Sequence, residues 1–153
     1  MENVYVVFDT NAYRTLTYGL TEFEVKAKFK AIKEAESKKD IRPILSHVTG
    51  MELLAHLADL CDPGFGPCKI ASIAAGYHCL TKENKLPYLA HPQILLQNLI
   101  FGDVDEPTAK QFEVVIELIN LLATKPASQI IDTYPEQLNA IEAIVKKHES
   151  DFK

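Results

Sequence analysis

The chain has 153 residues, 47% of them hydrophobic, and 16 Lys and Arg against 21 Asp and Glu give a formal net charge of −5. This length fits one domain with one core, and the acidic balance excludes a global field that attracts nucleic acid, so any such binding has to be local or metal-mediated. Without a membrane-length apolar run, a signal-peptide pattern or a CxxC pair among the three cysteines, we expect a cytoplasmic protein with reduced thiols.

The first strand and helix are predicted from short local patterns. Residues 4–8 form an apolar run rich in β-branched and aromatic side chains, which is typical of a strand buried on both faces of a parallel sheet. Thr21 and Glu24 have the spacing of a capping box, which predicts a helix over residues 21–38. One face of this helix carries Phe23, Ala27 and Ala31.

A second strand and helix follow. Residues 41–45 predict a short strand, and Pro43 indicates an edge position or a strand start. Ser46 can cap the next helix, which is rich in Leu. The order strand–helix–strand–helix predicts one βαβ crossover followed by a helix.

The remainder of the chain predicts helices only. They span about residues 68–82, 91–100, 108–123 and 135–149, the last one preceded by a second capping-box spacing from Thr133 to Glu136. Two strands are too few for a buried parallel sheet, and α/β domains alternate strand and helix to their end. Either the fold is an unusual helical one or the chain is the front part of a longer protein, and we favour the second interpretation.

Two acidic residues carry the most informative chemistry. Asp9 directly follows the first predicted strand, where open α/β sheets bind their ligands. Glu52 lies early in the helix that follows the second strand, so adjacent parallel strands bring it towards Asp9. Two converging carboxylates are unfavourable without a cation or a proton between them. A plain turn at Asp9 and an exposed helix acid at Glu52 are the alternatives.

The pattern Val-Val-Phe-Asp9-Thr-Asn11, a helix, a strand and Thr49-x-x-Glu52-Leu-Leu resembles the N-terminal half of a PIN domain. That family includes toxins of toxin–antitoxin pairs and enzymes of RNA processing. The resemblance implies a three-layer α/β fold with a parallel sheet, predominantly helical and incomplete at the C-terminus. It implies one domain over residues 1–153, with the motifs in residues 1–60 and a helical part in 61–153.

The same resemblance implies a ribonuclease that uses Mg²⁺ or Mn²⁺ to activate water and stabilise phosphate charge. Asp9 and Glu52 would be its catalytic residues and metal ligands, Asn11 would orient them, and Ser46 or Thr49 would assist near the helix start. The implied partners are RNA and an antitoxin-like protein inhibitor.

The sequence departs from that family because no later strand–helix junction supplies its further acids. Asp103 and Asp105 fit a turn and helix cap better than a ligand set, and Asp132 also precedes a predicted helix. With two acids alone we expect weak metal affinity and little or no activity.

Other clusters have simpler interpretations. The spacings of Cys61, Cys68, Cys79, His56 and His78 match no common zinc pattern, so these are predicted to be mainly core and surface residues. His47 lies close enough in sequence to contact a phosphate, although a first-turn His is more often exposed. Lys26, Lys30 and Lys33 form a stripe that favours a solvated face over an RNA track.

The competing hypothesis is a non-catalytic, mostly helical module that binds protein or RNA, with residues 114–122 contacting a partner. An incomplete sheet also exposes an unpaired edge and apolar helix faces, which predicts a homo-oligomer.

Overall fold

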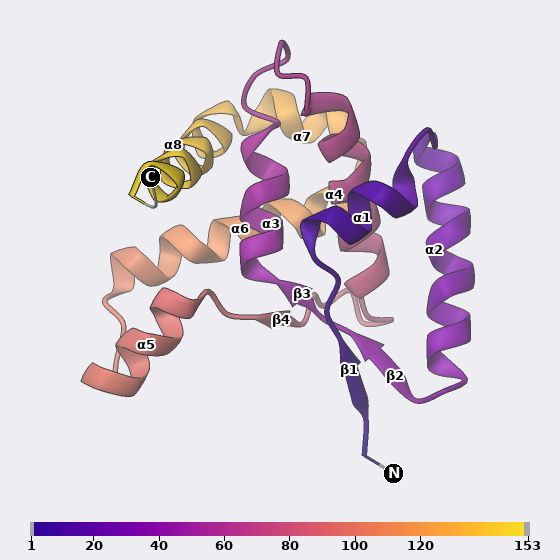
Figure 1. Ribbon diagram of the computed structural model, residues 1–153, viewed down its shortest axis with the longest axis horizontal. Helices are drawn as coiled ribbons and strands as arrows, with labels where there is room; N and C mark the ends of the chain where they lie inside the picture. The colour runs from indigo at the N-terminus through magenta and orange to yellow at the C-terminus, as the bar shows by residue number, and fades with distance from the viewer. Residues whose placement is uncertain (1, 152–153) are drawn as a thin grey trace.

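The computed structural model describes residues 2–151, apart from the side chain of Thr108. This part of the chain is an α/β structure dominated by eight helices, with four short strands (Figure 1). The strands are β1 (Val4–Val6), β2 (Ile41–Pro43), β3 (Leu45–Ser46) and β4 (Tyr88–Leu89). The helices are α1 (Thr10–Thr17), α2 (Glu22–Ser37), α3 (His47–Ala55), α4 (Phe65–Cys79), α5 (Pro92–Phe101), α6 (Glu106–Thr124), α7 (Ala127–Thr133) and α8 (Pro135–Asp151). None of these helices combines the length and apolarity needed to cross a membrane.

The strands pair in parallel around one interrupted central strand. β1 pairs with β2, and β3 pairs with β4, while Ile44 alone separates β2 from β3. The amide of Ile44 donates to Val6 and the next amide, of Leu45, donates to Pro87. Consecutive amides of an extended chain point to opposite sides, so β1 and β4 flank the central segment.

The apolar sequence of the first strand predicted burial on both faces, and this prediction is wrong. β1 is an edge strand with exposed side chains. Val4, Tyr5 and Val7 are 57%, 60% and 42% exposed. The apolar run predicts the strand correctly, but its burial depends on neighbours that the local pattern does not encode. Phe8, two residues after the end of β1, is the residue of this run that packs against the core.

Helix α4 is the centre of the core, and it packs against α1, α2, α3 and α6. Six consecutive residues of α4, numbers 71–76, are buried, and most of them are small. A Cβ added to Gly76 would lie 2.5 Å from the carbonyl oxygen of Ile119. Glycine at this position therefore allows the close crossing of α4 and α6.

Helix α2 begins with the predicted capping box but presents a different face to the core. Thr21 accepts from the amide of Glu24, and the Glu24 side chain accepts from the amide of Thr21. The face containing Phe23, Ala27 and Ala31 is exposed, whereas Val25 and Phe29 are fully buried. The apolar residues of α2 occupy two faces, each with one phenylalanine, and the face with Val25 and Phe29 is the one that packs inside.

Three elements, α1, α7 and β4, were not predicted from the sequence. The second capping-box prediction is wrong, because Thr133 is the last residue of α7 and its hydroxyl donates to the carbonyl of Gln129. Helix α8 begins with Pro135 instead. Proline suits a first helical position because it lacks the amide that would otherwise have no partner there.

Residues 114–122 belong to α6 and pack inside the protein, which leaves them little surface for a partner. Val115, Leu118, Ile119 and Leu122 are each at most 2% exposed. The exposed apolar helix is α5, in which no residue is buried. It lies at the lower left of Figure 1, at the margin of the molecule.

Candidate functional site

Asp9 is held at the end of β1 by the start of α1. Its backbone is extended, with φ −81° and ψ 174°, and its carboxylate accepts a 2.7 Å hydrogen bond from the amide of Ala12. This is the geometry of an N-cap residue, in which a side-chain oxygen satisfies an amide of the first helical turn. One carboxylate oxygen is engaged in this way, and the side chain remains exposed.

Glu52 lies on α3, which follows β3 without a connecting loop. The hydroxyl of Thr10 donates a hydrogen bond to the Glu52 carboxylate. Because Thr10 directly follows Asp9, this bond brings the two acidic residues of the predicted site to the same end of the sheet. Glu52 is exposed, although its helix neighbours on both sides in sequence are buried.

Thr49, the other polar residue predicted near the site, is buried beneath it. It is 4% exposed, and its hydroxyl lies 3.5 Å from the carbonyl oxygen of Phe8. The hydroxyl of Ser46 occupies the N-cap position of α3 but makes no capping hydrogen bond. Thr49 thus connects α3 to the end of β1, where Asp9 begins.

The two carboxylates suit a hard divalent cation that keeps much of its water. Neither Asp9 nor Glu52 forms an ion pair with a Lys, Arg or His within residues 2–151. Each has one oxygen in a neutral hydrogen bond and a second oxygen that can face a ligand. Mg²⁺ typically binds through one or two carboxylates plus waters, and Asp9 and Glu52 are the two carboxylates that this end of the sheet offers. No group of three or more potential ligating residues occurs in the described part of the chain.

The remaining acidic candidates lie elsewhere. The carboxylate of Asp103 accepts from the amide of Val104 in the turn before α6, and Asp105 directly precedes that helix. Asp132 is exposed within α7. The turn interpretation of Asp103 and Asp105 agrees with this placement.

His47 is buried, so it cannot contact a phosphate as one sequence hypothesis had it. It is 1% exposed, and its Nε2 lies 2.8 Å from the carbonyl oxygen of Phe112. The ring packs against those of Phe112 and His91, with centroid distances of 5.0 and 5.6 Å. Burial lowers the pKa of His47, and so the residue is a neutral part of the core.

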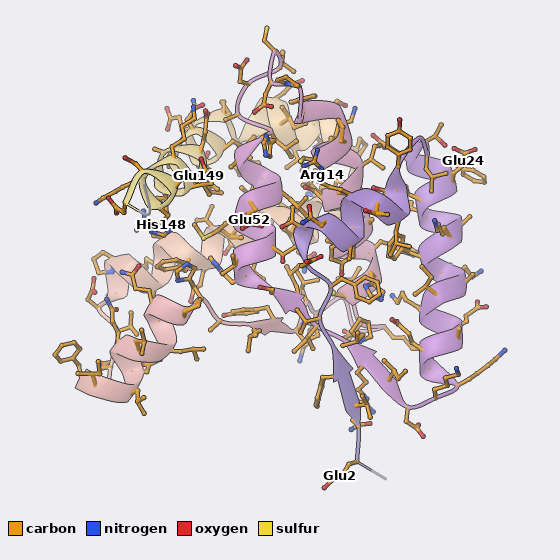
Figure 2. All side chains as sticks on the ribbon, in the orientation of Figure 1. Glu2, Arg14, Glu24, Glu52, His148 and Glu149 are labelled. Atoms are coloured by element: carbon orange, nitrogen blue, oxygen red, sulfur yellow. The ribbon has the colours of Figure 1, made fainter. Side chains whose placement is uncertain are left out.

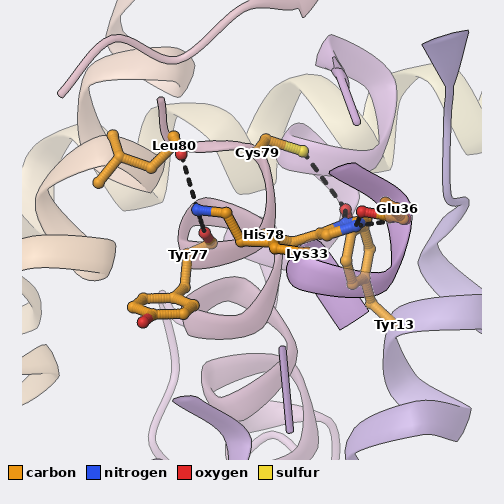
Figure 3. Close-up of polar contacts among 7 residues, drawn as sticks. All are labelled: Tyr13, Lys33, Glu36, Tyr77, His78, Cys79 and Leu80. Atoms are coloured by element: carbon orange, nitrogen blue, oxygen red, sulfur yellow. Dashed lines mark hydrogen bonds and ion pairs between the residues drawn. The ribbon is translucent and has the colours of Figure 1, made fainter. Parts of the chain in front are cut away.

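A buried polar network that the sequence did not predict lies under α1 (Figure 3). The hydroxyl of Tyr13 lies 2.9 Å from Nδ1 of His78 and 3.5 Å from the sulfur of Cys79. On the other side of the ring, Nε2 of His78 lies 2.9 Å from a Glu36 carboxylate oxygen. Lys33 donates to the carbonyl oxygens at the end of α4, those of Tyr77 and Leu80.

The protonation states of this network follow from its geometry. Burial lowers the pKa of His78, which is therefore neutral, and its Nε2–H donates to Glu36. Nδ1 then accepts from the hydroxyl of Tyr13, whose pKa is raised by burial. Burial raises the pKa of Cys79 to about 12, so its thiol can donate to the Tyr13 oxygen. Tyr13, His78 and Cys79 are buried at the centre of the network, which joins α1, α2 and α4.

The opposite face of α1 borders an open cleft of about 750 Å³. Asn11 belongs to this wall, and in the described part of the chain no hydrogen bond joins its side chain to Asp9. The cleft is lined by Asn11, Arg14, Thr15, Thr17, Tyr18, Gly19, Leu20, Gly66, Pro67 and Ile70. Figure 2 shows Arg14 on α1 and Glu52 on the neighbouring α3.

Comparison of the chain with models of protein families, with curated proteins and with solved structures finds no match in any of the three. Its function has to be inferred from the geometry of the site.

Proposed function

We propose that the chain is a PIN-like, divalent-metal-dependent ribonuclease, or its catalytic front part, with the three-layer fold that this family resemblance implies. The observation that carries the proposal is the hydrogen bond from Thr10 to Glu52. It holds the acid of α3 against the residue that follows Asp9, at the C-terminal ends of the parallel strands β1 and β3. Open α/β sheets bind ligands at that end of their strands.

The protein residues have separate tasks in this proposal. Asp9 and Glu52 provide the carboxylate oxygens. Thr10 holds the Glu52 side chain, and Thr49 binds the backbone of Phe8, the residue before Asp9. A bound Mg²⁺ or Mn²⁺ supplies Lewis acidity and a more acidic water for phosphodiester hydrolysis. Because two protein carboxylates are a small ligand set, the expected affinity for the ion is weak and the expected activity is low.

The test is cleavage of a labelled single-stranded RNA with Mn²⁺ or with a chelator, using Asp9→Asn and Glu52→Gln. Both substitutions remove a charge and preserve the local hydrogen bond, because Asn also caps helices and Gln can accept from Thr10. Asp132→Asn on α7 is a charge-matched control. We expect cleavage only with Mn²⁺, abolished by either site variant and unchanged in the control.

Cleavage that persists in the chelator, or in both site variants, would contradict the proposal. A folded protein that binds RNA but never cleaves it would instead favour the second candidate function.

That second candidate is a non-catalytic binding module, and the exposure of α5 favours it. Leu99, Ile100 and Phe101 are 83%, 67% and 78% exposed, and α5 contains no charged residue. Its only polar side chains are Gln93, Gln97 and Asn98, and a helix with so large an apolar surface normally packs against another element. A second copy of this chain is the occupant that we propose for this surface.

The exposed area is sufficient for such a contact. The apolar side chains of β4 and α5 expose roughly 550 Å², taking about 100 Å² for a whole aliphatic and about 200 Å² for a whole aromatic side chain. The side chains counted are Tyr88, Leu89, Leu95, Leu96, Leu99, Ile100 and Phe101. Complete coverage of these side chains on two copies would bury about 1,100 Å² in total, which just reaches the ~1,000 Å² expected of a specific interface. Since α5 is uncharged, the two helices meet without like-charge repulsion.

A further inference from the structure

We infer that the cleft beside α1 binds single-stranded polynucleotide, with Arg14 on a phosphate and Tyr18 stacked on a base. This assignment rests on the proposed nuclease function for its choice of ligand. The residues that carry it are distinct from the acidic pair.

One wall of the cleft is formed by a face of α1. Helical spacing places four residues on the same side: Asn11 and, three, four and seven positions after it, Arg14, Thr15 and Tyr18. The opposite side carries Tyr13, which is fully buried and does not line the cleft. The helix therefore presents a polar and aromatic stripe to the cleft and its other face to the core.

Arg14 is suited to a phosphate. It is one of two arginines in the chain, and within residues 2–151 it forms no ion pair. The lining of the cleft includes no Asp or Glu, although the whole protein carries a net charge of −5. A guanidinium with unoccupied donors forms bidentate contacts with phosphate oxygens.

Tyr18 is suited to a base. It is 88% exposed at the end of α1, although an exposed aromatic ring has no packing role there. Aromatic rings bind bases of single strands by stacking, which tolerates any sequence. The adjacent Gly19 and, across the cleft, Gly66 leave open space where a Cβ would stand.

The cleft begins close to Asp9 along the chain, because Asn11, which lines it, lies two residues after Asp9. Asp9 caps α1, and Arg14 lies five residues further on, about 7.5 Å along the helix axis. A strand whose phosphate reaches Asp9 and Glu52 can therefore place a neighbouring phosphate at Arg14. Asn11 and Thr15 lie on the same stripe and offer hydrogen bonds to the backbone between these points.

The test is fluorescence anisotropy with labelled oligo(rU) and oligo(dT) of equal length, in a chelator so that binding is independent of any metal. We expect Arg14→Ala to weaken binding about tenfold and to reduce the slope of log K against log salt by about 0.7, as for one lost phosphate contact. Tyr18→Ala should weaken binding roughly 5- to 150-fold, whereas Tyr18→Phe, which keeps the ring, should bind like wild type.

Two further variants separate the cleft from general charge effects. Arg42→Ala removes the other arginine, which is exposed on β2, and should leave binding close to wild type. Gly66→Glu introduces an acid into the cleft near the N-terminus of α4, where a carboxylate favours the helix. It should retain thermal stability and lose binding.

The outcomes distinguish this inference from the nuclease proposal. Equal effects of Arg14→Ala and Arg42→Ala, or unchanged binding in Tyr18→Ala and Gly66→Glu, would overturn the cleft assignment even if Mn²⁺ binds at Asp9. Arg14- and Tyr18-dependent binding without Mn²⁺ binding would support the cleft and contradict the nuclease proposal. Equal affinity for the two oligonucleotides assigns recognition to phosphate and base, and stronger binding of oligo(rU) adds a contact to the 2′-hydroxyl.

Discussion

Replacing Tyr13 by Phe removes a single oxygen from the middle of the buried network. The ring keeps its place among Phe8, Phe29 and His78, so the substitution opens no large cavity. Nδ1 of His78 loses its donor, and the ring cannot exchange its proton to the other nitrogen without losing the bond to Glu36. The thiol of Cys79 also loses its partner.

The expected decrease in the free energy of unfolding is about 2 kcal/mol. Tyr13 is fully buried and His78 is 1% exposed, so water cannot replace the missing hydroxyl without a structural change. A buried acceptor left without a partner costs about 1–3 kcal/mol, and the weaker thiol contact adds little. For a protein of this size, with a typical stability of about 5–15 kcal/mol, the loss is readily measured.

Urea unfolding at pH 7.5, followed by circular dichroism, measures this difference. With a typical dependence of about 2 kcal/mol per molar urea, the midpoint of Tyr13→Phe should fall by about 1 M. Tyr18→Phe is the matched control, because it removes the same atom from the exposed tyrosine that directly follows α1. If both variants change stability by less than about 0.5 kcal/mol, the network does not stabilise the fold as argued.

Three other predictions concern pH, helix packing and association. Burial lowers the pKa of His78 in the folded state, so the unfolded chain binds more protons at acidic pH. The free energy of unfolding should therefore fall as the pH drops below about 6.5. His78→Gln should make this pH dependence shallower in urea titrations between about pH 5 and 7. Gly76→Ala should destabilise by about 2 kcal/mol or more, because its Cβ meets the Ile119 carbonyl at 2.5 Å, and thermal unfolding measures the loss. Wild type should associate with rising concentration in sedimentation velocity, and Leu99→Lys with Phe101→Lys should remain monomeric.

Each of these predictions has a defined contradiction. A pH dependence that is the same in His78→Gln as in wild type would assign acid lability to other groups. A Gly76→Ala protein as stable as wild type would show that α4 and α6 can move apart without loss of stability. For association, Phe23→Lys on α2 is the control, since Phe23 is 83% exposed outside the proposed interface; a wild-type protein that stays monomeric at all concentrations would exclude the α5 contact.

Local sequence patterns predicted those elements whose signals are contained within one turn or one strand. The capping box of Thr21 and Glu24 located the start of α2, and the apolar run before Asp9 located β1. The helical predictions for α4, α5, α6 and α8 agree with the structure apart from a few residues at their ends. These patterns depend on residues close together in the sequence, and so they predict helices and strands without knowledge of the tertiary structure.

The missed features depend on contacts between distant residues. Helix α1 was not predicted, because its eight residues include only three apolar side chains, Ala12, Tyr13 and Leu16. β4 is only two residues long and exists through its pairing with β3. Likewise, no spacing rule links Tyr13 to His78, which lie 65 residues apart.

The candidate site was predictable in part. Asp9 and Glu52 were selected because parallel strands bring their ends together, and the structure connects Glu52 to Thr10 at that end of the sheet. The burial of Thr49 was not predictable, since the sequence cannot tell which face of α3 meets Phe8.

The most direct test of the metal site is Mn²⁺ titration followed by paramagnetic broadening of backbone amide signals, on wild type, Asp9→Asn, Glu52→Gln and Asp132→Asn. Saturable broadening centred on Thr10 and Glu52 in wild type and Asp132→Asn, and lost in the other two variants, is the predicted result. Broadening that is absent, or equal in all four proteins, would contradict a metal site at the end of β1.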